Sequence, residues 1–126
     1  MNASAWRGGF TLIEMSVVVA IIGVLFATVV PLYGTTVRRA KETALREDLQ
    51  ALRKTIDLYF RDREAWPADL DALVRDGYLR AIPVDPMTER ADTWTTVPSS
   101  EGAIDVFDVH SGAPGIALDG TAFAAW

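Results

Sequence analysis

The sequence FTLIEMSVVVAIIGVLFATVVP occupies residues 10–31, near the start of a chain of 126 residues. Sixteen of these 22 residues are apolar, and the only charged one is Glu14. As an α-helix the segment is about 33 Å long, which is enough to cross the hydrocarbon core of a bilayer. A buried core helix is disfavoured, because a chain this short has no interior that can surround a helix that is apolar on every side. The segment is therefore predicted to be a transmembrane helix.

The nine residues before this helix, MNASAWRGG, are short and mostly polar, with one basic residue, Arg7. A secretory signal peptide would have its small-residue cleavage site after the apolar stretch. Here the small pair Gly8-Gly9 precedes the stretch instead. Cleavage after Gly9 would keep the apolar helix in the mature protein, with Phe10 as its first residue and Glu14 one helical turn from the new amino terminus.

The run GGFTLIEMSVVVAIIGVL, residues 8–25, resembles the class III signal of type IV pilins and of type II secretion pseudopilins. The points of resemblance are Gly9 before the cut, Phe10 after it, Glu14 in the fifth mature position and the unbroken apolar run that follows. The resemblance implies that a membrane-embedded prepilin peptidase removes the leader and then N-methylates Phe10. It also implies that subunits assemble through the apolar helix into a helical filament.

Glu14 is an unusual residue for an apolar helix, and a carboxylate in hydrocarbon is a functional candidate by default. Before assembly it lies five residues into the segment, near the headgroups, where water can reach it. Once helices leave the lipid and form a dry filament core, the carboxylate needs a positive partner. The free amine of Phe10 is the obvious partner, from the same chain or from a neighbour. In the family resembled, the neighbour's amine is the usual assignment, and it sets the axial register.

Two signals disagree on the orientation of the helix in the membrane. Arg38, Arg39 and Lys41 follow the apolar segment, whereas only Arg7 and the initial amine precede it, so the positive-inside rule alone would put the C-terminal part in the cytoplasm. The processing signature requires a cytoplasmic N-terminus. We follow the signature and expect a single-pass protein of the inner membrane, with residues from about Tyr33 onward in the periplasm and a periplasmic filament after assembly.

From residue 32 to 63 the chain continues as a helix of different character, because its apolar residues lie at steps of three and four and form one stripe. The stripe consists of Val37, Ala40, Ala44, Leu45, Leu49, Leu52, Ile56, Tyr59 and Phe60. Pro31 and Gly34 lie where the apolar and amphipathic parts join. Proline removes a backbone donor and clashes with the preceding turn, so we expect a kink or a loosened joint there. Without a strong breaker between 35 and 63, a single helix over 10–63 is predicted, about 80 Å long.

Charged residues occupy the other faces of this amphipathic part. Glu42 and Arg46, and Asp57 and Arg61, are pairs of opposite sign four residues apart. Each such pair is worth a few tenths of a kcal/mol. We interpret the charged surface as a solvated helix face, in preference to a set of bridges between subunits.

Trp66-Pro67 ends the long helix, and residues 64–126 then form a series of short elements. We expect a helix over 68–75 capped by Gly77, an extended connector over 82–86, strands over 93–97 and 103–109, and a third strand over 116–118. Val106 and Phe107 are adjacent and both apolar, which predicts a bulge or a strand covered on both faces.

The 63 residues from 64 to 126 cannot bury a large core alone, so they have to pack against the apolar stripe of the long helix. The predicted fold class is α+β, a long N-terminal helix with a small antiparallel sheet packed on its C-terminal half. The predicted organisation is a cleaved leader over 1–9, a transmembrane and filament-core helix over 10–31, an amphipathic continuation over 32–63 and a globular head over 64–126.

The head narrows the resemblance to the major pseudopilin of type II secretion systems. The residues that carry it are Trp66-Pro67, Leu70, Ala72-Leu73-Val74, Gly77-Tyr78-Leu79, Ile82-Pro83 and Asp85-Pro86. The resemblance covers residues 9 to about 86 and implies a subunit of a short periplasmic pseudopilus. It also implies its partners: further copies of the chain, the prepilin peptidase, an inner-membrane assembly platform with a cytoplasmic ATPase, and minor pseudopilins.

Two departures from that pattern leave a minor pseudopilin or a minor type IV pilin open. The family commonly has a Trp-Gly-Asn-Pro type turn where this chain has Met87-Thr88-Glu89-Arg90. Its head also commonly carries a calcium-binding loop rich in Gly and Asp, whereas residues 108–115, DVHSGAPG, contain no dense carboxylate cluster. Calcium takes roughly six to eight oxygen ligands, and the candidates here are Asp105, Asp108 and Asp119. The alternative, which we favour, is that these carboxylates cap turns.

Composition argues against several classes of function. With 12 Lys and Arg against 17 Asp and Glu, the net charge of −5 disfavours a nucleic-acid partner. The chain has no cysteine and one histidine, His110, which excludes disulfides, thiol nucleophiles and the usual zinc sites within one chain. His110 and Ser111 would point to opposite faces of a strand, and we expect no enzyme activity.

Two functions of different classes remain, a structural filament subunit for secretion and a monomeric membrane-anchored module that uses an acidic head to bind calcium or a partner. The feature that discriminates between them is Glu14 together with the Gly9-Phe10 junction. A simple membrane anchor needs neither, so this combination favours the filament subunit.

Overall fold

The computed structural model describes Gly9 and residues 11–126. Its main element is α1, an α-helix of 52 residues over Leu12–Arg63 that is continuous through Pro31. The prediction of a single long helix is confirmed over this range. The residue expected to begin that helix, Phe10, lies outside the described residues.

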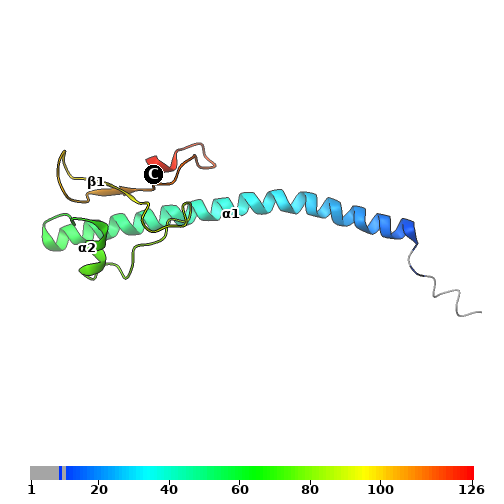
Figure 1. Ribbon diagram of the computed structural model, residues 1–126, viewed down its shortest axis with the longest axis horizontal. Helices are drawn as coiled ribbons and strands as arrows, with labels where there is room; N and C mark the ends of the chain where they lie inside the picture. Colours follow the sequence, from blue (N-terminus) through cyan, green and yellow to red (C-terminus); the bar gives the residue numbers. More distant parts are fainter. Residues whose placement is uncertain (1–8, 10) are drawn as a thin grey trace, which may run out of the picture. The chain divides into compact units, whose positions relative to one another are not determined.

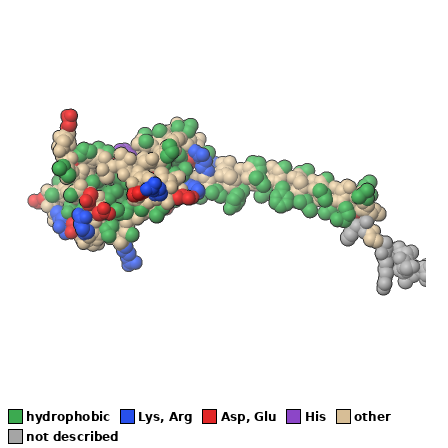
Figure 2. Space-filling view, viewed as in Figure 1, with side chains coloured by type: hydrophobic (Ala, Val, Ile, Leu, Met, Phe, Trp, Pro, Cys, Tyr) green, Lys and Arg blue, Asp and Glu red, His purple; other side chains and the backbone are tan. Residues whose placement is uncertain are grey.

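The chain forms two compact units, divided between Val37 and Arg38, and α1 contributes residues to both. Among the described residues of the first unit, α1 is the only helix or strand, and its large apolar side chains are exposed. Figure 2 shows hydrophobic side chains along this part and charged side chains over the second unit. By length and composition, the apolar part of α1 is able to cross a membrane, and none of its most apolar window is buried within the chain.

The second unit has a hydrophobic core, and the amphipathic part of α1 forms one side of it. Leu45, Leu49, Leu52 and Ile56 lie at helical spacing and are each at most 2% exposed, as the predicted stripe requires. They belong to one cluster with apolar residues from the other elements, among them Leu73, Val106, Val109 and Phe123. Burying one such side chain is worth roughly 1.5–3 kcal/mol, so α1 is an essential part of the core. Figure 1 shows the remaining elements gathered along this part of α1.

The second helix, α2 over Leu70–Arg75, begins two residues later than predicted. It starts there because the Asp69 carboxylate accepts a hydrogen bond from the Ala72 backbone N–H at 2.7 Å, which makes Asp69 the N-cap. Gly77 caps the C-terminal end of the helix, as predicted, and it does so with a positive φ of 83°. The N–H of the next residue, Tyr78, donates to the carbonyl of Leu73 at 2.8 Å, the bond that defines a Schellman motif.

The sheet has two antiparallel strands, β1 over Thr95–Val97 and β2 over Asp108–His110, with Thr96 opposite Val109. The small antiparallel sheet is confirmed, but both strands are shorter than predicted. The first half of the expected strand over 103–109 is not part of the sheet. The reason is that the Val106 N–H donates to the carbonyl of Pro67, outside the sheet, at 2.8 Å. Val106 is therefore buried against the segment that follows α1, and no bulge forms within β2.

The third predicted strand, over 116–118, is wrong. Ile116 and Ala122 form only an isolated bridge, and a turn at Asp119-Gly120 reverses the chain at once. The turn leaves too few residues on each side for a ladder. The chain then enters η2, a short 3₁₀-helix over Phe123–Ala125, whose first side chain is 1% exposed in the core.

Candidate functional site

The start of α1 is held by a reciprocal pair of hydrogen bonds between Thr11 and Glu14. The Thr11 hydroxyl accepts from the Glu14 backbone N–H at 3.2 Å, and the Glu14 carboxylate accepts from the Thr11 backbone N–H at 3.1 Å. This is a capping box, which satisfies two backbone donors that the helix itself cannot satisfy. The pattern Thr-x-x-Glu over residues 11–14 is its sequence signal, so Glu14 has a role in the single chain besides the predicted role in assembly.

The capping box leaves the Glu14 carboxylate able to bind a second donor. A carboxylate has about four acceptor positions, and the hydrogen bond to Thr11 uses one of them. The side chain is exposed and lies at the N-terminal end of α1, where the helix dipole favours negative charge. Gly9 is exposed and precedes the helix. The expected cation, the amine of Phe10, lies outside the described residues.

Pro31 and Gly34, the expected joint, both lie inside α1. A Cβ added at Gly34 would meet no described atom within 4 Å, so packing does not require a glycine there. The hydroxyls of Thr35 and Thr36 donate to the carbonyls of Pro31 and Leu32, at 3.3 and 2.8 Å. These bonds satisfy both hydroxyls within the helix. A kink or a loosened joint at this point stays a prediction.

Asp105, Asp108 and Asp119, the three calcium candidates, each accept a hydrogen bond from a donor within the chain. The nitrogen-to-oxygen distances are 2.8 Å for Ser99 to Asp105, 2.9 Å for Arg53 to Asp108 and 2.9 Å for Arg46 to Asp119. Within the part of the chain that the structure describes, no group of three or more His, Cys, Asp or Glu is arranged to hold a metal ion.

Asp119 is held through both of its carboxylate oxygens. Thr121 donates to it through its hydroxyl at 2.6 Å and its backbone N–H at 3.0 Å, and Arg46 binds the other carboxylate oxygen. These contacts lower the pKa of Asp119 below its ordinary value of 3.8, the Thr121 hydroxyl contributing most. The carboxylate is therefore charged at neutral pH and directed toward α1.

Asp85 is a fully buried carboxylate, 0% exposed, that the sequence indicated only through the family resemblance. The Ser111 hydroxyl donates to it at 2.6 Å and the Met87 backbone N–H at 2.8 Å. These bonds connect the turn after Asp85 to the loop that follows β2. Burial, and secondarily the charge of Asp85, raises the pKa of Asp48 on α1.

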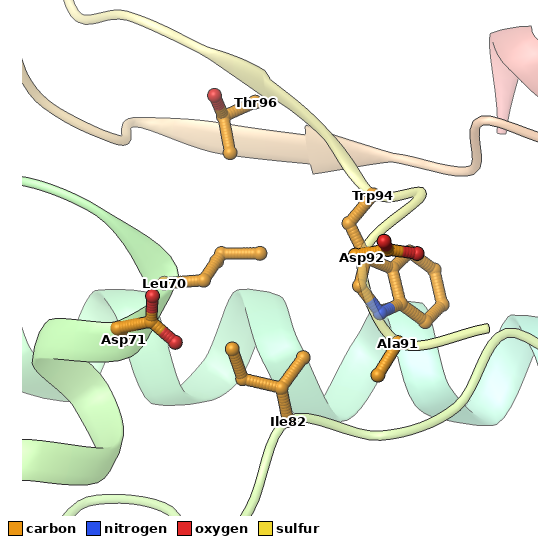
Figure 3. A pocket seen from close by; sticks show the side chains of 7 residues that line it. All are labelled: Leu70, Asp71, Ile82, Ala91, Asp92, Trp94 and Thr96. Carbon is orange, nitrogen blue, oxygen red and sulfur yellow. The ribbon is translucent and has the colours of Figure 1, made fainter.

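A surface pocket of about 390 Å³ opens beside α2 (Figure 3). Its lining consists of Leu70, Asp71, Ile82, Ala91, Asp92, Trp94 and Thr96. The Trp94 indole N–H donates to the carbonyl of Pro83 at 2.8 Å, and Arg90 binds the Asp92 carboxylate at 2.6 Å. The lining of this described pocket has two carboxylates, Asp71 and Asp92, and no histidine, cysteine or serine.

His110 and Ser111 have separate partners, as the prediction that they face apart requires. His110 contacts the carbonyl oxygen of Trp126 through Nδ1, and its Nε2 lies 3.6 Å from the Asp108 carboxylate. The Ser111 hydroxyl instead donates to Asp85. The two residues therefore do not form a nucleophile and base.

Comparison with known proteins agrees with this geometry. A family model described as the prokaryotic N-terminal methylation motif matches residues 7–30. The type II secretion system core protein G of Pseudomonas aeruginosa is 35% identical over 119 residues, which cover 82% of this chain and 82% of that protein. No solved structure matches the chain significantly.

Two further relatives carry the same name. The type II secretion system core protein G of Dickeya chrysanthemi is 37% identical over 116 residues, covering 79% of this chain and 74% of that protein. The Escherichia coli protein of this name is 33% identical over 123 residues, covering 84% and 83%. The chain therefore belongs to the family of type II secretion system core protein G, the major pseudopilins, which are structural and not enzymatic proteins.

Proposed function

We propose that this chain is processed at the Gly9–Phe10 bond and assembles through α1 into the pseudopilus of a type II secretion system. The observation that carries the proposal is the apolar part of α1, none of whose most apolar window is buried within the chain. A helix that exposes apolar side chains on every face requires lipid or copies of itself around it. Lipid surrounds the helix while the chain is in the membrane, and copies of the same helix surround it after assembly.

Processing by a prepilin peptidase is supported by the N-terminal methylation motif, which matches residues 7–30. Gly9 is exposed and lies before the first residue of α1. The proposed cut is after Gly9. Cleavage there and N-methylation would leave methylated Phe10 as the first residue.

In the assembled filament, Glu14 binds the amine of Phe10 on a neighbouring copy. The carboxylate holds the Thr11 N–H and keeps acceptor positions for the second donor. In the dry core of the filament an unpaired carboxylate would be strongly unfavourable, so the pair fixes the axial position of each subunit. Before assembly, the capping box keeps the carboxylate directed toward the N-terminal end of α1.

The chain enters this pathway as a single-pass protein of the inner membrane, with its N-terminus in the cytoplasm and its head in the periplasm. The apolar part of α1 is long enough for one crossing. The inner-membrane assembly platform and the minor pseudopilins are its partners, together with further copies of the chain. The family membership supports this set of partners.

Intact-mass measurement of the membrane-extracted protein tests the processing step. The expected mass is that of residues 10–126 plus one methyl group. A chain that keeps residues 1–9 and stays monomeric would contradict the proposal and favour the membrane-anchored binding module.

Glu14→Ala tests the assembly step separately. We expect normal cleavage but loss of filaments, measured by cross-linking and by electron microscopy of material sheared from cells that express the secretion system. Ser16→Ala is the matched control, because the Ser16 hydroxyl only donates to the Leu12 carbonyl of its own helix, at 2.8 Å. Filaments of normal length and number from Glu14→Ala would remove the proposed role of this residue.

A further inference from the structure

One row of charged residues on α1 faces the loop that follows β2. Arg38, Glu42, Arg46 and Arg53 are separated by four, four and seven residues, so they lie along one side of the helix. We call these four residues the charge row. Arg53 contacts β2 itself, and the other three contact the chain that follows β2.

Two arginines of the charge row bind carboxylates, one of them in β2 and the other in the loop that follows. Nη2 of Arg46 lies 2.9 Å from Asp119, and the Arg46 guanidinium stacks 4.1 Å from the centre of the Trp126 ring. Arg53 donates from Nε to Asp108 and from Nη2 to the carbonyl of the residue after it, both at 2.9 Å. These contacts tie β2 and the loop to α1.

The other two members of the row bind the middle of the loop through its backbone. Arg38 donates to the carbonyl of Ile116, and the Glu42 carboxylate accepts from the Leu118 N–H at 2.8 Å. Glu42 is 8% exposed, and Nε of Arg38 lies 3.5 Å from its carboxylate. The buried negative charge is therefore compensated by an arginine of the same row.

These contacts do not fit a calcium ion in the loop. A calcium site needs several carboxylates directed at one point. Here Asp108 and Asp119 are each held by a guanidinium group, and Asp105 accepts from Ser99. A divalent cation at Asp108 or Asp119 would have to displace an arginine and would then lie close to its positive charge.

We infer that the charge row holds the loop in this chain without a bound cation, and that the fold of this head does not depend on calcium. The three arginines supply the positive charge. The hydrogen bonds of the row hold β2 at Asp108 and Val109 and the loop at Ile116, Leu118 and Asp119. The inference concerns the single chain and does not depend on filament assembly.

The melting temperature of the full-length protein in detergent micelles tests the inference, followed by near-UV circular dichroism. We expect the same melting temperature with calcium chloride and with a chelator such as EGTA. Arg46→Gln is expected to lower it by about 1–8 °C, the range of a half-exposed ion pair in a domain of this size. Arg39→Gln is the matched control, since Arg39 is an exposed arginine of the same helix outside the charge row, and it should change the melting temperature by less than about 1 °C.

Two results would overturn the inference. A melting temperature that rises with calcium or falls with EGTA would show that the wild-type head needs the ion. An equal effect of Arg46→Gln and Arg39→Gln would show that the charge row does not hold the loop. Should Arg46→Gln fail to fold, Asp119→Asn removes the same ion pair from the other side, and a value equal to that of Arg39→Gln would again contradict the inference.

Discussion

At Gly112 the backbone passes so close to Thr93 that only a glycine fits. A Cβ placed there would lie 1.9 Å from the Thr93 carbonyl oxygen, and a backbone atom cannot move aside easily. We expect Gly112→Ala to destabilise the head by about 1–3 kcal/mol, as overpacking typically does. Thermal melting should show the loss, with Gly34→Ala as control because its Cβ would meet no described atom within 4 Å. An unchanged melting temperature for Gly112→Ala would contradict the close approach.

Asp48 is a half-buried carboxylate on α1 that lowers the stability of the head at neutral pH. Burial and the neighbouring charge of Asp85 raise its pKa above the ordinary value of 3.8. A carboxyl whose pKa is raised on folding binds its proton more tightly in the folded state, so stability is lost as the pH rises from 3.8 through the folded pKa. Replacing this carboxylate with a neutral amide should remove that loss.

Asp48→Asn is therefore expected to raise the melting temperature at pH 7 by a few degrees at most, because the site is only half buried. The gain should disappear at a pH below 3.8, where the wild-type carboxyl is protonated in both states. Asp57→Asn is the control, an equal change of charge at an exposed position of the same helix. A gain that is the same at both pH values would contradict the titration of Asp48 as its cause.

At the scale of elements, α2 depends on its N-cap. Asp69→Ala removes the acceptor of the Ala72 N–H and should cost about 1 kcal/mol. In a domain of this size that loss lowers the melting temperature by about 4–8 °C. Asp69→Asn keeps a capping oxygen and should retain most of the stability. Equal losses in the two variants would assign the effect to the charge of Asp69 and not to the cap.

The long helix could be predicted from sequence because its signal is local and repeats along the chain. The strands could not be placed so well, because their limits depend on distant partners. Val106 is a β-branched residue of the kind that favours strands. Its N–H nevertheless donates to the carbonyl of Pro67, 39 positions earlier in the chain, so Val106 does not pair within the sheet. The cap formed by Thr11 and Glu14 is local, and its signal is the Thr-x-x-Glu pattern over residues 11–14.

At the scale of the whole molecule, the head and the second half of α1 share one core. A fragment over 38–126 contains every buried apolar residue of the described chain and should melt cooperatively as a soluble monomer. A fragment over 64–126 lacks Leu45, Leu49, Leu52 and Ile56 and should be unfolded. Circular dichroism and sedimentation distinguish the two results, and a cooperative transition in the shorter fragment would contradict the shared core.

The motif that contains Gly9 and Phe10 could be recognised from sequence because it is continuous, and the family match over residues 7–30 includes it. The contacts of the loop after β2 could not, since Arg46 and Asp119 are 73 positions apart in the chain. The sequence predicted that Glu42 would pair with Arg46. In the structure Glu42 instead lies beside Arg38 and accepts from the Leu118 N–H, because the fold brings a closer donor to the carboxylate.

Both members of the pair at the start of α1, Thr11 and Glu14, lie on the same side of the bond after Gly9. Severing that bond would take away neither of the hydrogen bonds that begin the helix. Precursor and mature chain would thus share one helical boundary, and the peptidase would cut beside a finished structural element without having to unwind it.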